Sequence, residues 1–528
     1  MEPARLPPAA RGGHALGRRH DRVGGGHRGR GGLRAVYRGE ARAARVFAER
    51  HGRARPARDP GSLDPPRLGR DGSLPRPQSA PKASAVDRDS ARSGRGGRHE
   101  LDRPQPPRGR RPLAVSGGRA APRGPAGHAR TGVLARRRSG AAAPVTRVGA
   151  GLSTAPSAAG AARQAAAEAG AALRGADADL AFLFLSPAHW EEADDAVEAV
   201  ESQLAPRHLV GCVAEGVVGR NRELEEGPGV AVWAGSLPGA DIRSFHAATI
   251  ETDEGVGIVG FPSFEDAALV TLLVDPFTFP AAPLIAKLNE DFPGLPLVGG
   301  VAAGGGRPGT QVLVHDGELH EEGAVGAVVS GVPVRTVVSQ GCAPIGRDAV
   351  ITRAEDNVVF ELAGEPALER LREEVTALPP EEQRLAAEGL LAGLVIDENV
   401  PEYGRGDFLV RGLIGADEGT GAIALGEHVR VGQTLRFHIR DARSADEDLR
   451  ESLAAALAGD RPAGALLFTC NGRGSQMFAE PDHDARVVTE ALGSSGLAGF
   501  FCAGEIGPVG GRTFLHGFTA TMAVFLDA

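Results

Sequence analysis

The sequence is poor in cysteine and has no long apolar runs. Only 4 of its 528 residues are cysteines, and no Cys-x-x-Cys pair occurs, so we expect neither a disulfide framework nor a zinc site. No run approaches the roughly 18 consecutive apolar residues of a membrane-spanning helix, and the N-terminus lacks the short apolar core of a signal peptide. These absences predict a cytoplasmic protein with no membrane partner, no metal and no cofactor.

Charge divides the chain near residue 145. Residues 1–150 hold 34 Lys and Arg against 11 Asp and Glu, a net charge of +23, whereas the remainder holds 25 against 56, a net charge of −31. The modest overall charge of −8 therefore conceals two oppositely charged parts. The chain is also too long for a single hydrophobic core.

The first 144 residues are rich in Arg, Gly and Pro and show no sustained apolar periodicity. Such a composition cannot bury enough apolar surface to offset chain entropy, so we expect residues 1–144 to be disordered. A basic tail would attract nucleic acid, but no RGG-type repeat with regular aromatics is present, and we expect no specific nucleic-acid partner. A third interpretation is a mis-assigned start, because Lys82 is the only lysine of this stretch and Val145 is a candidate first residue.

From residue 145 onward, helical and strand patterns alternate, and strands then dominate. The predicted helices span residues 155–174, 191–204, 283–289, 365–378, 380–391 and 483–492, and the continuous apolar run 179–186 predicts a buried strand. Ser444 stands three residues before Glu447, which predicts a helix that opens at Ser444 with a capping box. The pattern indicates an α+β fold of two linked strand-rich domains with flanking helices, at residues 145–378 and 379–528.

Three glycine-rich segments carry features that a strand does not need. The first, LVGGVAAGGG at residues 297–306, contains Gly299 and Gly300, which would allow a ligand to approach the backbone. It does not match the dinucleotide-binding pattern, because no helix and no ribose-binding acid follow. A tight turn is the alternative interpretation.

The second segment, TCNGRG, ends the apolar strand that contains ALLF, and ligands commonly bind at strand ends in open sheets. Cys470, Asn471 and Gly472 are therefore candidate ligand contacts. Arg473 offers a planar fork for a carboxylate or phosphate, and its alternative role is an ion pair with a structural acid.

The third segment, GFFCAGEIGPVGG, contains Cys502 and Glu505, and His516 follows in TFLHGFT. Glu505 has little side-chain cover there, so we expect it to contact a ligand or to pair with an arginine such as Arg411, Arg440 or Arg473. The grouping of Cys, Glu and His is also compatible with a nucleophilic Cys502. The alternative is that Cys502 is a small buried residue and His516 a hydrogen-bonded core histidine.

From residue 145 to the C-terminus, these segments resemble the FIST family, whose FIST-N and FIST-C domains occur together. The matching stretches are LVGCVAEGVVG, PLVGGVAAGG, SQGCAPIG with ELAGEPAL, GDFLVRG, FHIRDARSADEDL, LLFTCNGRG, GFFCAGEIGPVGG and FLHGFTA. The most specific group is CNGRG followed by GEIGP and LHGFT. The resemblance does not extend to residues 1–144.

The resemblance implies a sensory domain of signal transduction that binds a small molecule, such as an amino acid or a related metabolite. Members of the family are fused to histidine kinases, methyl-accepting receptors or an F-box. This sequence shows none of those patterns, so we expect its output to pass through a separate signalling partner protein. Two alternatives stay open: a Cys502-dependent enzyme, and a protein-interaction scaffold without a small ligand.

In the favoured hypothesis Arg473 would hold an anionic group of the ligand, and Glu505 an amine or guanidinium. The family carries no settled catalytic residue to transfer, so none is predicted here. The candidate ligand-binding residues are Gly299, Gly300, Arg411, Arg440, Cys470, Asn471, Gly472, Arg473, Cys502, Glu505 and His516.

Overall fold

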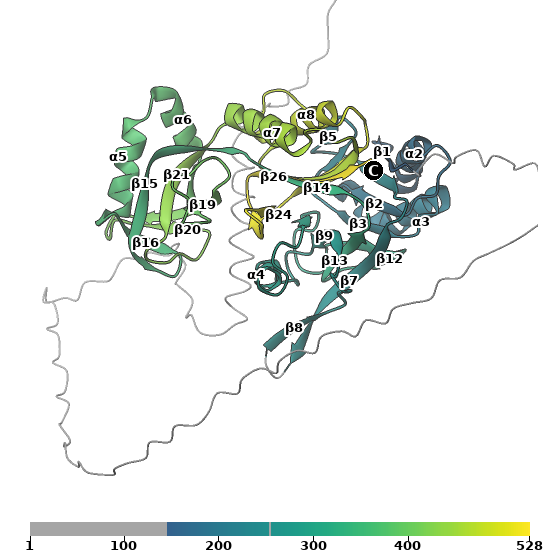
Figure 1. Cartoon of the computed structure of the whole chain (residues 1–528), viewed down its shortest axis with the longest axis horizontal. Helices are drawn as coiled ribbons and strands as arrows, with labels where there is room; N and C mark the ends of the chain where they lie inside the picture. The colour runs from purple at the N-terminus through teal and green to yellow at the C-terminus, as the bar shows by residue number, and fades with distance from the viewer. Residues whose placement is uncertain (1–144, 253–254, 528) are drawn as a thin grey trace, which may run out of the picture. The chain divides into compact units, whose positions relative to one another are not determined.

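The computed structural model describes residues 145–252 and 255–527, and the predicted N-terminal segment 1–144 lies outside the described residues. Helices and strands alternate along this part of the chain, so the predicted α+β class is confirmed (Figure 1). The strands form four sheets, of which three share one hydrophobic core. No helix within the described residues combines the length and the apolar character that crossing a membrane requires.

Three successive stretches of chain, called repeats 1, 2 and 3 below, contain corresponding elements. Repeat 1 contains β1 (Arg147–Ser153), α2 (Ala158–Ala172), β2 (Leu180–Leu185), η1 (Pro187–Glu192), α3 (Ala193–Leu204), β3 (Leu209–Val213), β4 (Val217–Gly219), β5 (Arg222–Leu224) and β6 (Val230–Ser236). Repeat 2 contains β7 (Asp241–Thr252), β8 (Gly255–Val259), β9 (Ala267–Val274), α4 (Ala281–Asp291), β10 (Leu297–Val301), β11 (Leu313–His315), β12 (Glu318–His320) and β13 (Ala324–Ser330). Repeat 3 contains β14 (Val334–Gln340), α7 (Ala442–Ala456), β22 (Pro462–Cys470), η2 (Gly474–Gln476), α8 (His483–Leu492), β23 (Leu497–Cys502), β24 (Glu505–Val509), β25 (Arg512–His516) and β26 (Thr519–Leu526).

The three repeats build sheets of the same topology. Their strands lie in the orders β1-β6-β2-β3, β7-β13-β9-β10 and β14-β26-β22-β23. In each sheet the last two strands of that order are parallel, whereas the other neighbours are antiparallel. A helix leads into the second of the parallel strands in every repeat, as a parallel connection requires. The chain therefore contains an internal threefold repeat.

The short hairpin that follows this parallel pair leaves its own sheet and completes another. Hairpin β4–β5 of repeat 1 pairs with β23, β11–β12 of repeat 2 pairs with β3, and β24–β25 of repeat 3 pairs with β10. Equivalent backbone hydrogen bonds accompany the exchange, from Val213 N to Val312 O (2.9 Å), from Val301 N to Gly504 O (2.8 Å) and from Phe501 N to Gly216 O (3.0 Å). Each repeat gives its hairpin to one of the other two repeats and receives a hairpin from the remaining one, so the three sheets are joined in a ring.

Equivalent glycines fix the close approach of the parallel strands. Gly211, Gly299 and Gly499 are each the third residue of their strand, and each pairs with a leucine of the parallel neighbour. A Cβ atom at any of the three would collide with the carbonyl oxygen of that leucine. Gly299 therefore has a structural role within a buried strand.

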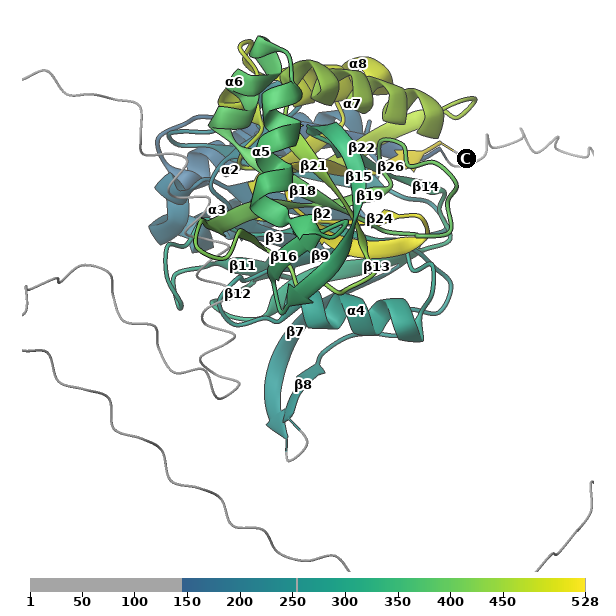
Figure 2. The same cartoon turned by 90° about the vertical axis from the view of Figure 1, so that its left-hand side faces the viewer.

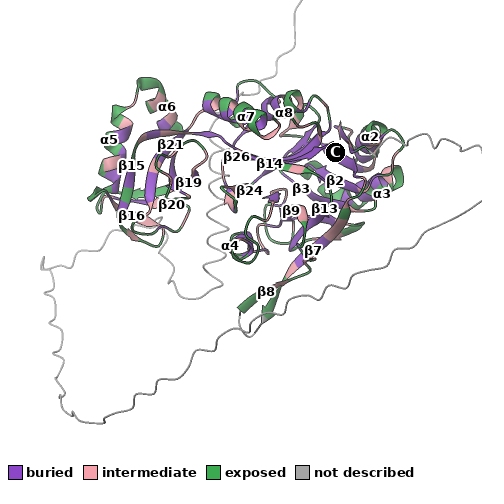
Figure 3. Cartoon of the chain, in the orientation of Figure 1, coloured by how far each residue is buried: buried purple, intermediate pink, exposed green. Residues whose placement is uncertain are grey.

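The central core lies where the inner faces of the three sheets meet. Trp233 of repeat 1 has its ring centroid 4.9 Å from that of Phe525 of repeat 3, and Phe184 lies 5.3 Å from Phe500. Leu273 of repeat 2 belongs to the same buried cluster. Helices cover the outer faces: α2 and α3 pack on the sheet of repeat 1, α4 on that of repeat 2, and α7 and α8 on that of repeat 3 (Figure 3).

A small barrel is inserted into repeat 3 between β14 and α7. It contains β15 (Cys342–Glu355), β16 (Val358–Leu362), β17 (Glu365–Pro366), α5 (Ala367–Ala377), α6 (Pro380–Glu388), β18 (Leu390–Val395), β19 (Phe408–Asp417), β20 (Ala422–Leu425) and β21 (Thr434–Arg440). The strand order β15-β21-β18-β19-β20-β16 closes through a pairing of β15 with β16. Helices α5 and α6 lie beside the barrel strands (Figure 2), and their apolar residues belong to the same buried cluster. The predicted boundary between residues 378 and 379 falls between these two helices.

Two local predictions are wrong. Helix α7 does not open at Ser444 with a capping box, because it begins at Ala442 after the N-cap Asp441. The Asp441 carboxylate accepts the backbone N–H groups of Arg443 (3.2 Å) and Ser444 (3.3 Å), so the earlier aspartate takes the capping role. The helix predicted to run to residue 391 ends at Glu388, because the chain enters strand β18 after Gly389.

Candidate functional site

A cleft of about 2280 Å³ lies where strand ends of the three repeats meet the barrel. Each repeat lines it at the same position, four residues after its equivalent glycine, with Glu215, Ala303 and Ala503. The barrel contributes Arg411 and its neighbours on β19 and in the loop after β20. The cleft is thus built at one end of the repeat ring.

The segments singled out in the sequence converge on this cleft. Asn471 donates its backbone N–H to the carbonyl oxygen of Cys502 at 2.9 Å, which joins CNGRG to GFFCAGEIG. Glu505 pairs with His516 across the hairpin β24–β25, and on its other side it pairs with Gly300 of β10. Four segments that are far apart in sequence therefore lie side by side.

The predicted residues divide into those that line the cleft and those that lie behind its wall. Seven of the eleven line it: Arg411, Arg440, Cys470, Asn471, Gly472, Cys502 and His516. The lining does not include Gly299, Gly300, Arg473 or Glu505. A Cβ atom on Gly300 would collide with the sulfur of Cys502, so this glycine makes room for the cysteine.

Two of the basic side chains that line the cleft are already paired. Arg411 donates Nε and Nη2 to Glu427, both at 3.0 Å, and its Nη1 and Nη2 also reach the carbonyl oxygens of Val410 (3.0 Å) and Leu515 (2.8 Å). Lys287 pairs with Asp291 at 2.6 Å. Arg411 thereby ties β19 of the barrel to β25, and a carboxylate already balances the charge of each of these two cations.

Arg440, at the end of β21, is the third basic side chain of the lining. Its Nη2 donates to the carbonyl oxygen of Gly472, and its guanidinium carbon lies 5.8 Å from the ring centroid of Phe518. Among the residues that the structure describes, no carboxylate forms an ion pair with Arg440, and its Nε has no hydrogen-bond partner. The Nε is buried, but a guanidinium has five donors, so Arg440 has N–H groups beyond Nε and the one bonded to Gly472.

Glu215 is a cleft residue that the sequence analysis did not single out. It is exposed, and its Oε2 accepts the side-chain N–H of Asn471 at 2.5 Å. Although the residue as a whole is exposed, partial desolvation of its carboxyl group, and then repulsion from Glu225, raises the pKa of Glu215. Its position corresponds to Ala303 in LVGGVAAG and to Ala503 in FFCAG, and this correspondence becomes apparent only when the structure aligns the repeats.

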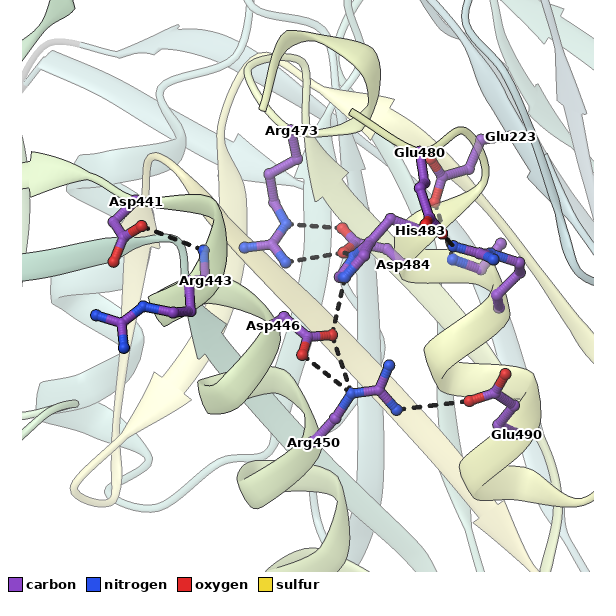
Figure 4. A network of polar contacts seen from close by, with 12 residues as sticks. Glu223, Asp441, Arg443, Asp446, Arg450, Arg473, Glu480, His483, Asp484 and Glu490 are labelled. Atoms are coloured by element: carbon purple, nitrogen blue, oxygen red, sulfur yellow. Dashed lines mark hydrogen bonds and ion pairs between the residues drawn. The ribbon is translucent and has the colours of Figure 1, made fainter. Parts of the chain in front are cut away.

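Arg473 turns away from the cleft into a buried polar network (Figure 4). Its side chain is 0% exposed, and Nε and Nη2 donate to the two carboxylate oxygens of Asp484 at 2.7 and 2.8 Å. Asp484 also accepts from Thr469 (2.9 Å) and contacts His483 (3.0 Å), which reaches Asp446 at 2.9 Å. Arg473 therefore has the alternative role considered for it, an ion pair with a structural acid.

The polar residues of the third glycine-rich segment, and His516 after it, are buried as well. Glu505 is fully buried, and its Oε2 accepts the backbone N–H and the hydroxyl of Thr519 at 3.0 and 2.9 Å. Burial raises the pKa of Cys502 well above that of a free thiol, whereas burial lowers the pKa of His516 to about 4. The Cys502 sulfur contacts the carbonyl oxygen of Phe500, and His516 contacts that of Gly507. These environments oppose thiolate formation and favour the core roles of both residues.

Comparison with known proteins identifies the family. The model of the FIST N domain matches residues 179–365, and that of the FIST C domain matches residues 367–508. An uncharacterized protein of Mycobacterium tuberculosis (strain CDC 1551 / Oshkosh) is 49% identical over 386 residues, which cover 72% of this chain and 100% of the relative. An uncharacterized protein of Mycobacterium bovis (strain ATCC BAA-935 / AF2122/97) is 47% identical over 386 residues, covering 72% of this chain and 99% of the relative.

The chain therefore belongs to the FIST family, whose domains are sensory domains of signal-transduction proteins. The two matched models meet near residue 366, inside the barrel between β17 and α5. The first match covers repeat 1 from β2 onward, repeat 2 and β14, and the second covers repeat 3 from α7 to β24. The hairpin exchange thus joins the two FIST domains into one ring of sheets.

Proposed function

We propose that this chain is a cytoplasmic sensory protein that binds a small zwitterionic metabolite, of the amino-acid class, in the cleft between the strand ends and the barrel. Ligand occupancy would be passed on through a separate signalling protein. The proposal rests on the position of Arg440, which lines the cleft and whose Nη2 bonds to the carbonyl oxygen of Gly472, with no carboxylate paired to it among the described residues. Within the cleft it is the basic side chain best placed to take a carboxylate.

The acidic counterpart of Arg440 is Glu215. Glu215 accepts from the side chain of Asn471, and Arg440 donates to the carbonyl oxygen of Gly472, so the two charges flank adjacent residues. Opposite charges held beside two adjacent residues, Asn471 and Gly472, match the carboxylate and ammonium groups of one small molecule. These two side chains take the roles that the sequence analysis gave to Arg473 and Glu505, because those two are buried in pairings of their own.

The apolar part of the wall supports a ligand with an organic side chain. Phe518 lies beside the Arg440 guanidinium, and Phe501 and Leu515 line the same cleft. A largely apolar wall with a few placed polar groups is the usual composition of a small-molecule site. The cleft exceeds the roughly 300–1,000 Å³ of typical ligand pockets, so one amino acid would occupy only the part near Arg440.

A thermal-shift screen of the full chain against the proteinogenic amino acids, their decarboxylated amines and their deaminated acids tests the proposal. A ligand at 100 times its Kd adds about 2.7 kcal/mol of stability, which moves the unfolding midpoint by several degrees. We expect hits among the zwitterions and weaker shifts with the matched amine or acid. Flat responses to all three sets would overturn the proposal.

A further inference from the structure

The carboxyl group of Glu223 lies at the junction of repeats 1 and 3, outside the proposed ligand contacts. Glu223 lies on β5, in the hairpin that repeat 1 contributes to the sheet of repeat 3. Its Oε1 accepts the backbone N–H of Ala485 at 2.8 Å, and its own backbone N–H donates to Asp482 Oδ1 at 2.7 Å. The exchanged hairpin is thus fastened to the start of helix α8.

The side chain of Glu223, which belongs to repeat 1, caps the N-terminus of helix α8 in repeat 3. Its own N-cap residue, Asp482, has a left-handed backbone with φ of 60° and makes no side-chain capping bond. The N–H of Ala485, the third helical residue, would otherwise be one of the unpaired donors of a helix start. Glu223 therefore supplies from repeat 1 the bond that a local Ser or Asp normally supplies.

The surroundings of Glu223 oppose its ionisation. The charged groups that face it are Asp484 at the start of α8, Arg473 before η2, and Glu225 beyond β5. The hydrogen bond from Ala485 and the attraction of Arg473, which is itself paired with Asp484, favour the ionised carboxylate, but burial and the repulsion of Asp484 outweigh them. The second oxygen of Glu223, Oε2, is buried without a hydrogen-bond partner among the described residues, so a negative charge there would be poorly solvated.

We propose that Glu223 is a proton-operated clasp between repeats 1 and 3: its protonated carboxyl holds hairpin β4–β5 on the N-terminus of α8, and its ionisation loosens that contact. Burial, and then repulsion from Asp484, raises the pKa of Glu223 from an ordinary 4.5 to about 8. A raised acid pKa stabilises the closed form at low pH, and this stabilisation is lost as the pH rises from 4.5 through about 8. The clasp therefore loosens near neutral and mildly alkaline pH.

The clasp also has a structural connection to the cleft. Gly216, which directly precedes β4, accepts the backbone N–H of Phe501, and the adjacent Glu215 lines the cleft. Beyond β5, Glu225 accepts the backbone N–H and hydroxyl of Ser475, both at 2.7 Å, beside the Asn471–Gly472 segment. Loosening of the hairpin would displace Glu215, so the ligand affinity would fall with rising pH. This last consequence rests on the proposed function, whereas the clasp itself does not.

Hydrogen exchange of the ligand-free full chain, measured by mass spectrometry at pH 6.5 and 9 and corrected for intrinsic exchange rates, tests the clasp. Linkage between a closed pKa near 8 and an ordinary open value predicts about thirtyfold more opening of the hairpin and of the first turn of α8 at the higher pH. Glu223→Gln keeps the bond to Ala485 without a titrating group, so its protection should change less than threefold. Equal protection of the wild type at both pH values, or the same loss in Glu223→Gln, would overturn the proposal.

Two further measurements keep the test independent of folding defects. Glu318→Gln changes an exposed glutamate on β12, in the corresponding hairpin of repeat 2, and it should behave as the wild type does. Carbon-13 NMR of the wild type with labelled glutamate side chains should show one carboxyl, absent from the Glu223→Gln spectrum, that titrates near pH 8. A midpoint below pH 6 for that signal would contradict the clasp whatever the exchange data show.

Discussion

Asp484→Asn should destabilise the folded chain far more than the loss of one hydrogen bond. Asp484 is fully buried and accepts two hydrogen bonds from Arg473 and one from the Thr469 hydroxyl. Burial alone would raise the pKa of Asp484, but the attraction of Arg473 outweighs it and lowers that pKa below its usual range. The substitution removes the negative charge and leaves the guanidinium of Arg473 buried without a counter-ion.

The magnitude follows from that uncompensated charge. Breaking a buried pair by removing one partner costs about 3–5 kcal/mol, whereas replacing both partners by apolar residues is often nearly neutral. We therefore expect about 3–5 kcal/mol for Asp484→Asn and for Arg473→Met. The double variant Arg473→Met with Asp484→Leu should cost clearly less than the sum of the single variants. The coupling arises because each single change leaves one buried charge unpaired.

Urea denaturation of the full chain, followed by the fluorescence of the buried Trp233, measures these free energies. Exposed Arg450 pairs with Glu490 at 3.5 Å in the outer part of the same network, so Glu490→Gln is a matched control. It should change the stability by less than about 0.5 kcal/mol. A loss below 1 kcal/mol for Asp484→Asn, or strictly additive single and double variants, would refute the assignment of Arg473 and Asp484 as a buried structural pair.

Three other outcomes follow from local geometry. Asp441→Ala should lower the free energy of unfolding by about 1 kcal/mol in urea denaturation, because it removes the N-cap of α7. Ser444→Ala should leave that free energy unchanged, because the buried Ser444 hydroxyl has no hydrogen-bond partner among the described residues. Equal losses in the two variants would show that Ser444 caps the helix after all. Gly499→Ala should destabilise the chain by several kcal/mol because its Cβ meets the backbone of Leu467, and unchanged stability would show that the strands can separate. All four thiols are buried, and burial raises the pKa of Cys342 to about 12. A disulfide reagent at pH 7 should therefore label the native chain far more slowly than the chain unfolded in urea. Rapid labelling of Cys502 in the native chain would instead support the enzyme hypothesis.

Local patterns in the sequence predicted many individual elements. The apolar run of β2, the helix α8 and the α+β class follow from periodicity and burial, and the structure shows each of them. The family resemblance, carried by short motifs, is confirmed by the matched FIST models. These successes concern features that a dozen neighbouring residues determine.

The threefold repeat could not be seen from those patterns because its elements diverge. LVGCVAEG, LVGGVAAG and LAGFFCAG share the glycine that permits close strand packing, but a long barrel interrupts repeat 3 and helices differ among the repeats. The hairpin exchange pairs residues as far apart in the sequence as Val217 and Phe500, and no local propensity specifies it.

The candidate site could likewise be predicted only in part from the sequence. Sequence motifs located the wall of the cleft, since Cys470, Asn471 and Cys502 lie there. They did not reveal which way a side chain points: Arg473 and Asn471 are two residues apart, yet the first faces Asp484 and the second faces Glu215. That choice is made by tertiary partners, so it follows from packing and not from composition.

The central claim is that a small zwitterion binds beside Arg440. Its most direct test is isothermal titration of the strongest screening hit into the full wild-type chain, Arg440→Met and the control Arg436→Met. Arg436 lies on the same strand β21 outside the cleft lining. A charge-assisted hydrogen bond contributes about 1.5–3 kcal/mol, so Arg440→Met should weaken binding by roughly 10- to 150-fold. The control should bind as the wild type does, and equal affinity of wild type and Arg440→Met would contradict the account.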